Sequence, residues 1–416
     1  MSKKNSELVV EFCVELSRRM IVNGANLERV QLAVERICHA YHLSDVSTFL
    51  LSNIISLSAM DERGEYISRQ CTIPPAGIHL ERLKRLNRLS YEVVETTPTP
   101  AELPELLDNA SQVKERPDWQ ILLAQIAALC CLCLIFGGGT REILAVALVT
   151  AVLHYVMIFS TRLGLDRVVM NALNMFAATI AAIAVMQGGL STNGPVILIT
   201  VSMLVIPGIP LVNAVRNLLC GNEMNGILQI AKVVIETLAM GMGICLALWL
   251  FGLSDRMNNA VVTTMKNPWL LVLISFLASS SFGFVFRVSK EDIWLAGLGG
   301  ALTRIFLLAL APVFPQRLMY VSLSALAAAL YGELMATSRK DPSTYFIYPA
   351  IVPLIPGDLF YYALVALYLG DYPMFAGNAA NCLLTLFGMS IGFVLSSIIA
   401  HYIRRMRHAK LMGKKK

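Results

Sequence analysis

The segments 205-VIPG-208 and 354-LIPG-357 decide the fold, because they mark the same point in two copies of one unit. They lie 149 residues apart, and Arg141-Glu142 corresponds to Lys290-Glu291 in the same register. Proline and glycine are not generic components of an apolar sequence, so their matching spacing predicts an internal repeat. Further identities at this spacing are Gly221 with Gly370, Ala231 with Ala380, Met240 with Met389 and Gly243 with Gly392.

The chain around these segments is strongly apolar. Of its 416 residues, 56% are hydrophobic and 15% are charged, whereas about a quarter of a typical soluble domain is charged. Residues 1–118 hold 31 of the 62 charged residues. This composition excludes a fully soluble enzyme, a fibrous protein and a disordered chain. A nucleic-acid binder is excluded too, because the excess of basic residues lies beside apolar segments.

Ten apolar stretches follow residue 118, and most have the ~20 residues that cross a hydrocarbon core. With the N-terminus inside, sixteen basic residues flank the inner ends and four lie in outer loops. This bias predicts that both termini face the cytoplasm. The ten stretches lie near residues 119–136, 142–160, 168–186, 195–215, 227–252, 268–286, 292–311, 317–337, 344–369 and 373–403.

Each half of the repeat has five stretches, so the second copy must enter the membrane upside down. The fold class expected is therefore an all-α polytopic membrane protein, with ten transmembrane helices as an inverted 5+5 repeat. A small α+β cytoplasmic domain precedes them. The expected divisions are 1–118 for this domain, 119–252 for the first repeat, 253–266 for an external linker, 267–403 for the second repeat and 404–416 for a basic cytoplasmic tail.

The N-terminal part has the pattern of a small α+β domain. Helical spacing of apolar residues predicts a helix that ends at Asn23-Gly24 and a second one after Asn26. Residues 45–59 and 65–73 favour strands, and residues 79–95 favour a helix. Glutamates interrupt the first apolar run, so no secretory signal is expected.

Proline breaks the fourth and ninth stretches of the repeat. The fourth contains Pro207, Gly208 and Pro210, and the ninth contains Pro349, Pro353, Pro356 and Gly357. Proline frees backbone groups at membrane depth, and such groups are tolerated only against protein or a wet cavity. Paired breaks therefore predict a binding site near the middle of the membrane; the alternative is a kink for packing. Polar residues follow each break: Asn213, Arg216 and Asn217 in one half and Asp358 in the other.

Five charged residues lie within or at the ends of apolar stretches: Lys232, Glu236, Arg304, Glu333 and Asp358. A charge at a helix centre is costly, so each is expected to face the bundle interior or water. Lys232 and Glu236 are four residues apart and can neutralise each other. Arg304 is a candidate to hold a carboxylate, and Asp358 to carry a proton or bind an ammonium group. Glu333 is expected near the cytoplasmic end, where water can solvate it.

No catalytic motif, metal site or cofactor is expected. Cys38, His39 and His42 are expected on one helix, and Cys71 and His79 lie further along the chain. The spacing of these five residues fits no standard zinc site. The partners expected are a small-molecule substrate, protons and the lipid bilayer, with no nucleic acid. Assembly into a homo-oligomer stays an open alternative.

The sequence resembles the threonine/serine exporter family over almost its whole length. The resemblance rests on 24-GANLERVQLAVERICHAYHL-43, 60-MDERG-64, 206-IPGIPLVNAVRNLLCGNEMNG-226 and 355-IPGDLFYYALVALYLGDYPMFAG-377. One departure is Asn222, since Asp371 takes the corresponding place after Gly370. The resemblance implies efflux of a small hydrophilic metabolite, driven by a proton gradient or the membrane potential. Split members of the family resemble dicarboxylate exporters, so the substrate class stays open.

The function expected is secondary active export of threonine or serine by alternating access, with protons as the antiported ion. Asp358 would then face the ammonium group, and Arg304 or freed backbone N–H groups would face the carboxylate. A dicarboxylate such as succinate would instead favour Arg304 and Arg216, with Asp358 protonated. Two other classes are a channel and a membrane-anchored enzyme or sensor that uses residues 1–118. Ten stretches are more than an anchor needs.

Overall fold

A computed structural model describes residues 3–51, 53–74, 77–191, 193–252, 265 and 267–413, and for 404–413 only the backbone. The expected external linker and basic tail therefore lie almost entirely outside the described residues and side chains. The chain divides into two compact units. Unit 1 comprises Met1–Arg116, Phe286–Asp292 and Gly332–Phe346, and unit 2 comprises Pro117–Val285, Ile293–Tyr331 and Ile347–Lys416.

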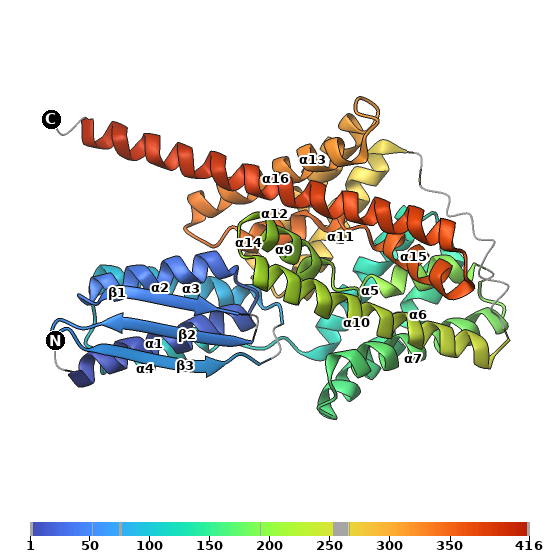
Figure 1. Cartoon of the computed structure of the whole chain (residues 1–416). Coiled ribbons are helices and arrows are strands. Elements are labelled where there is room, and N and C mark those ends of the chain that lie inside the picture. Colours follow the sequence, from blue (N-terminus) through green and yellow to red (C-terminus); the bar gives the residue numbers. More distant parts are fainter. Residues whose placement is uncertain are drawn as a thin grey trace. The chain divides into compact units, whose positions relative to one another are not determined.

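Unit 1 contains a three-stranded antiparallel sheet in the order β1-β2-β3, packed against helices (Figure 1). Ile55, Leu57 and Ala59 alternate along β2 and are buried, since α1 packs on β2 and β3. This confirms the small sheet expected near the N-terminus. Its elements are α1 (Lys3–Val22), α2 (Leu27–Ala40), β1 (Ser44–Leu50), β2 (Ile54–Met60), β3 (Tyr66–Thr72), α3 (Leu80–Thr96) and α4 (Leu103–Ser111).

Local signals set the ends of these elements. The side chain of Asn26 accepts a hydrogen bond from the Glu28 amide and so begins α2 as an N-cap. α1 ends at Val22, and Gly24 then has a φ of 97°, which favours glycine. The carboxylate of Asp61 accepts bonds from the amides of Arg63 and Glu65 and closes the hairpin between β2 and β3.

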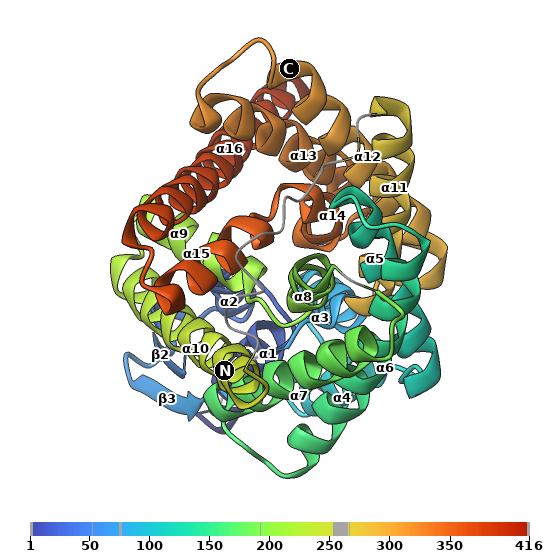
Figure 2. The ribbon, with the colours of Figure 1, turned by 90° about the vertical axis from the view of Figure 1, so that its right-hand side faces the viewer.

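Unit 2 is helical. Figure 2 shows α8 and α15 inside a ring of longer helices, and all nine residues of α8 are buried. The helices before residue 260 are α5 (Asp118–Ile135), α6 (Thr140–Arg162), α7 (Arg167–Gln187), α8 (Gly194–Ser202), α9 (Gly208–Leu219) and α10 (Glu223–Leu250). Those after it are α11 (Pro268–Val285), η2 (Lys290–Asp292), α12 (Ile293–Leu310), α13 (Arg317–Arg339), α14 (Thr344–Ala350), η3 (Val352–Leu354), α15 (Gly357–Leu369) and α16 (Tyr372–Gly413).

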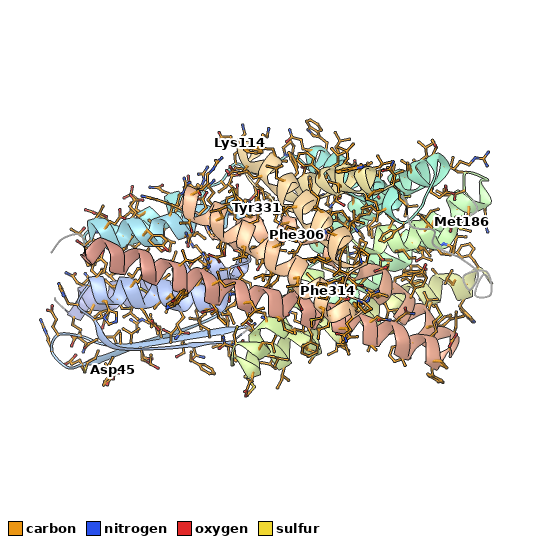
Figure 3. All side chains as sticks on the ribbon, turned by 90° about the horizontal axis from the view of Figure 1, so that it is seen from above. Asp45, Lys114, Met186, Phe306, Phe314 and Tyr331 are labelled. Carbon is orange, nitrogen blue, oxygen red and sulfur yellow. The ribbon has the colours of Figure 1, made fainter. Side chains whose placement is uncertain are left out.

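Within the described residues, nine helices are long and apolar enough to cross a membrane, rather than the ten expected. The fourth stretch is absent from this set, because the break at Pro207 divides it into α8 of 9 residues and α9 of 12 residues. Apolar side chains cover the outer faces of the long helices, and Phe306 on α12 is 39% exposed (Figure 3). Such surfaces suit a hydrocarbon environment, and the chain is a multi-pass membrane protein.

Two glycines allow pairs of long helices to approach closely. A β-carbon on Gly243 of α10 would lie 2.2 Å from the carbonyl oxygen of Ala172 on α7. A β-carbon on Gly392 of α16 would lie 2.6 Å from the carbonyl oxygen of Ser322 on α13. Both distances are too short for any real side chain, so each helix pair requires glycine at its contact.

Candidate functional site

The two Pro-Gly breaks have the same backbone conformation. Pro207 has φ −77° and ψ 57°, and Pro356 has φ −81° and ψ 54°. The amide of Gly208 donates to the carbonyl of Ile206 at 2.8 Å, and that of Gly357 donates to the carbonyl of Ile355 at 2.9 Å. These values describe an inverse γ-turn, which bends the chain directly before α9 in one case and α15 in the other. The structure therefore confirms both breaks that the prolines predicted.

Each turn starts a helix in the same way. The carbonyl of Pro207 accepts from the amide of Leu211 at 3.0 Å, and the carbonyl of Pro356 accepts from the amide of Phe360 at 3.1 Å. α9 and α15 therefore both begin at the glycine of the motif. The other prolines of the ninth stretch also lie at irregular points, because Pro349 is inside the short α14 and Pro353 is within η3.

The two turns pack against each other. A β-carbon on Gly208 would lie 2.6 Å from Cγ2 of Ile355, and one on Gly357 would lie 1.8 Å from the sulfur of Met203. The glycines therefore let the side chains of Ile355 and Met203 pack directly against the backbone of Gly208 and Gly357. α9 then enters the core of the later helices, where Leu211, Val212 and Val215 belong to one buried cluster with residues of α13, α14 and α16.

Asp358 lies in the first turn of α15, directly after the second turn. The positive end of the helix dipole favours a carboxylate there. Asp358 is half-buried and lies within electrostatic range of Arg304 on α12. The Nε of Arg304 donates to the hydroxyl of Ser275 on α11 at 2.9 Å, which holds its guanidinium in place. The structure thus brings the candidate anion and cation of unit 2 into one region.

The polar residues after the first turn are divided among three neighbours. The side-chain amide of Asn213 donates to the hydroxyl of Tyr348 at 3.0 Å, which joins α9 to α14. Arg216 donates to the hydroxyl of Ser397 on α16 at 3.3 Å. Asn217 is buried and donates to the side chain of Gln229 on α10 at 3.1 Å, so it ties α9 to the next helix.

Lys232 and Glu236, whose spacing would allow them to neutralise each other, differ in their surroundings. Lys232 is exposed, whereas Glu236 is 4% exposed, and the described contacts include no ion pair between them. The Oε1 atom of Glu236 has no hydrogen-bond partner among the described residues. The two residues share one face of α10, but the surrounding packing covers Glu236 and leaves Lys232 exposed.

Glu333 was expected to be solvated by water because of its place near a helix end, but its side chain is largely buried. Its side chain is 13% exposed and lies 3.3 Å from the guanidinium of Arg29 on α2, within unit 1. It therefore belongs to a different group of residues from Asp358. The described residues contain no group of three or more His, Cys, Asp or Glu side chains that could hold a metal ion.

Sequence reasoning missed three further candidate residues, which are Tyr348, Tyr361 and Ser275. The Tyr361 side chain is 2% exposed, and its hydroxyl has no hydrogen-bond partner among the described residues. All three residues lie in apolar stretches, where a hydroxyl is a weak signal. Tyr348 and Tyr361 flank the second Pro-Gly turn, and a search for hydroxyls around each break would have found them.

A groove of about 890 Å³ is lined by residues of α7, α10 and α15. Its lining is apolar and includes none of the candidate residues, so it does not have the chemistry to hold a hydrophilic substrate. The residues that line it include Val169, Phe176, Met242, Trp249, Leu364 and Tyr368.

Comparison with known proteins identifies the family. A family model described as putative threonine/serine exporter matches residues 11–251, and a model described as threonine/serine exporter, ThrE, matches residues 271–399. A probable threonine/serine exporter of Mycobacterium tuberculosis is 20% identical over 416 residues, which cover 95% of this chain and 77% of that protein.

Two relatives match the first part of the chain. Both are named probable succinate transporter subunit YjjP. The protein of Escherichia coli K12 is 23% identical over 61% of this chain and 98% of its own length. That of Klebsiella aerogenes is 22% identical over 60% of this chain and 97% of its own length. No solved structure matches. The two family models together cover most of the sequence, and the chain belongs to the threonine/serine exporter family, a family of transporters.

Proposed function

We propose that this protein is a secondary active exporter of threonine and serine in a bacterial inner membrane, driven by the proton gradient or the membrane potential. The observation that carries the proposal is the pair of matching Pro-Gly turns, Pro207-Gly208 and Pro356-Gly357, in a chain of this family. Broken helices at equivalent places are typical of the substrate sites of secondary transporters.

The proposal includes an inverted repeat of five plus five membrane segments. The turns agree in dihedral angles and in hydrogen bonds, and the agreement continues past the following helices. The amide of Asn222 donates to the carbonyl of Asn217, and that of Asp371 donates to the carbonyl of Ala366, both at 2.9 Å. Gly221 and Gly370 both have positive φ, 81° and 74°. These pairs keep the 149-residue spacing and support a duplicated unit.

The close helix contacts support the same repeat. Gly243 approaches the carbonyl oxygen of Ala172 and the amide nitrogen of Phe176, four residues apart on α7. Gly392 approaches the carbonyl oxygen of Ser322 and the amide nitrogen of Leu326, four residues apart on α13. Two helix pairs with the same contact are expected if one ancestral unit occurs twice.

The substrate site is proposed around Asp358 and Arg304. A zwitterionic amino acid has one ammonium and one carboxylate group, and the region offers one carboxylate and one guanidinium within electrostatic range of each other. Asp358 binds the ammonium group and Arg304 binds the carboxylate, with the hydroxyl of Ser275 fixing the guanidinium. Asn213 and Tyr348 form the nearby bridge between the two broken segments.

Both termini are proposed to face the cytoplasm. Sixteen basic residues flank the ends that are inside in this orientation, against four in the outer loops, which supports inward-facing termini. The exporter is proposed to work by antiport with protons. A homo-oligomer is compatible with the chain, because its long helices present apolar outer faces.

Succinate is the second candidate substrate, because two relatives of the first part of the chain are named as succinate transporter subunits. A dicarboxylate favours two cations. Arg216 lies on α9 after the first turn, and Arg304 lies within electrostatic range of Asp358 after the second. Arg216 already has the Ser397 hydroxyl as a partner, and it would have to release that bond.

Export from proteoliposomes tests the proposal. Vesicles loaded with threonine, serine or succinate are given an imposed proton gradient, and solute loss is compared with protein-free vesicles. The proposal expects faster loss of threonine and serine. Faster loss of succinate alone supports the second candidate, and no gain for any of the three contradicts the exporter proposal. Insensitivity to the gradient contradicts proton coupling. In the same assay the variant Asp371→Asn should export like the wild type, since Asp371 is an exposed helix cap.

A further inference from the structure

A cluster of charges in unit 1 joins α3 to two segments that continue into the later membrane helices. Nζ of Lys84 lies 2.7 Å from Oδ2 of Asp292 and 3.0 Å from Oδ2 of Asp341. Nε of Arg88 lies 2.9 Å from Oδ1 of Asp341. The Asp292 side chain is 2% exposed and that of Asp341 is 0% exposed. One ammonium group therefore holds two buried carboxylates from different loops.

The two loops also contact each other around this ammonium group. The hydroxyl of Tyr345 donates to Oδ2 of Asp292 at 3.0 Å, and its ring centroid lies 4.9 Å from Nζ of Lys84. The amide of Ser289 donates to the Tyr345 hydroxyl at 2.9 Å, and NH1 of Arg339 lies 3.0 Å from Oδ1 of Asp292. The segments 286–292 and 332–346 thus form one network with Lys84 at its centre.

Backbone contacts and a second helix add to this network. The amides of Leu80 and Glu81, in the first turn of α3, donate to the carbonyls of Phe286 and Arg287, both at 3.0 Å. These donors lack partners within their own helix, so the loop supplies them. Arg29 on α2 donates to the hydroxyl of Ser343 at 2.6 Å. α3 therefore contacts segment 286–292 through its backbone and the Lys84 side chain, and segment 332–346 is contacted by both α2 and α3.

We propose that residues 1–116 are a brace for the second membrane half. α3 fixes the segments 286–292 and 332–346 to each other, and segment 332–346 leads directly into α14, η3 and the turn at Pro356-Gly357. A buried charge that loses its partner is strongly destabilised, so the ion pairs of Asp292 and Asp341 stay closed. The brace keeps the start of the broken segment in place while Asp358 and its helix act on the substrate.

Hydrogen exchange of the full-length protein in nanodiscs, without substrate, tests the brace. In Lys84→Met, amides in segments 286–292 and 339–346 should exchange at least about tenfold faster than in the wild type, since both carboxylates lose a partner. Export should fall about tenfold, because the start of the broken segment then opens more often, whereas Lys84→Arg should retain both protection and export. Arg85→Gln is the matched control, because Arg85 is on the same helix and lies 3.5 Å from Glu81 at the surface.

Arg88→Gln is a second variant that does not depend on Lys84. The Arg88 side chain is 55% exposed and forms its ion pair with Asp341, so the chain should fold without it. Segment 339–346 should exchange faster, and segment 286–292 should not change. Unchanged exchange in both segments in both variants overturns the brace. If exchange is faster but export equals that of the wild type, transport does not require the brace. Exchange is measured without substrate, so it tests the brace even if the exporter proposal fails.

Discussion

Gly208 and Ile355 are in contact so close that a β-carbon on the glycine would lie 2.6 Å from Cγ2 of the isoleucine. Ile355 directly precedes the second Pro-Gly turn, so the two turns are in contact across unit 2. The neighbouring contact differs in kind. A β-carbon on Gly357 would meet the sulfur of Met203, which is on a flexible side chain, whereas the β-branched Ile355 is stiff.

Gly208→Ala should therefore be more harmful than Gly357→Ala. Overpacking costs typically about 1–3 kcal/mol, and Ile355 cannot relieve it by changing rotamer as easily as Met203 can. We expect a lower apparent Tm and a loss of export for Gly208→Ala, measured on the purified protein and in proteoliposomes. The double variant Gly208→Ala/Ile355→Ala should recover both. A double variant no better than the single one would show that the contact is not the cause.

Gly243→Ala and Gly392→Ala should destabilise the protein more than either change at the turns. The added methyl group would collide with the carbonyl oxygen of Ala172 in one case and that of Ser322 in the other, at 2.2 Å and 2.6 Å. Backbone cannot change rotamer, so the helices must separate. Gly377→Ala is the control, because nothing lies within 4 Å of its β-carbon position and alanine favours a helix by about 1 kcal/mol. Equal apparent Tm values for the three variants would contradict this account.

His79 should make unit 1 sensitive to acid. Burial, with the charges of Arg82 and Arg287, lowers the pKa of His79 from 6.5 to about 4, against the opposing charge of Glu115. The native state thus binds the proton less tightly than the unfolded chain. The contribution of His79 to the free energy of unfolding is fully present above about pH 6.5 and is lost as pH falls to about 4. This contribution is at most on the order of 3 kcal/mol.

Protonation of His79 would also disrupt the cap of α3. Nδ1 of His79 accepts a hydrogen bond from the amide of Arg82 at 3.2 Å, and a protonated Nδ1 cannot accept it. His79→Asn keeps a cap acceptor and removes the titration. The apparent Tm of the full-length wild type should fall more between about pH 7 and about pH 4 than that of His79→Asn. Parallel curves for the two proteins would assign the acid sensitivity to other groups.

The sequence could predict the features that depend on local rules. Proline without an N–H and glycine without a β-carbon place the turns at Pro207-Gly208 and Pro356-Gly357, and an amide side chain places the start of α2 at Asn26. The existence of both breaks could therefore be predicted from the sequence. Their shared dihedral angles and their contact with each other were not.

The remainder depends on contacts that spacing along the chain does not contain. The distance of four residues makes Lys232 and Glu236 neighbours on a helix, but only packing decides that Glu236 is buried and Lys232 exposed. Glu333 has its partner Arg29 at a separation of 304 residues. For the same reason, the grouping of Phe286–Asp292 and Gly332–Phe346 with Met1–Arg116 in unit 1 could not be predicted from spacing along the chain.

Asp358 and Arg304, the charged pair of the proposed substrate site, can be tested separately. Asp358→Asn removes the carboxylate and keeps its shape, so threonine export should fall at least about tenfold if that group binds the ammonium, a loss of about 1.4 kcal/mol or more in transition-state binding. Ser275→Ala removes the hydroxyl that accepts from Arg304 at 2.9 Å. Its effect should be a higher KM for threonine with a smaller change in maximal rate, because Arg304 remains but is less well oriented. Asp371→Asn should export like the wild type. Wild-type export by Asp358→Asn would remove Asp358 from the mechanism, and an unchanged KM in Ser275→Ala would remove the Arg304 orientation from it.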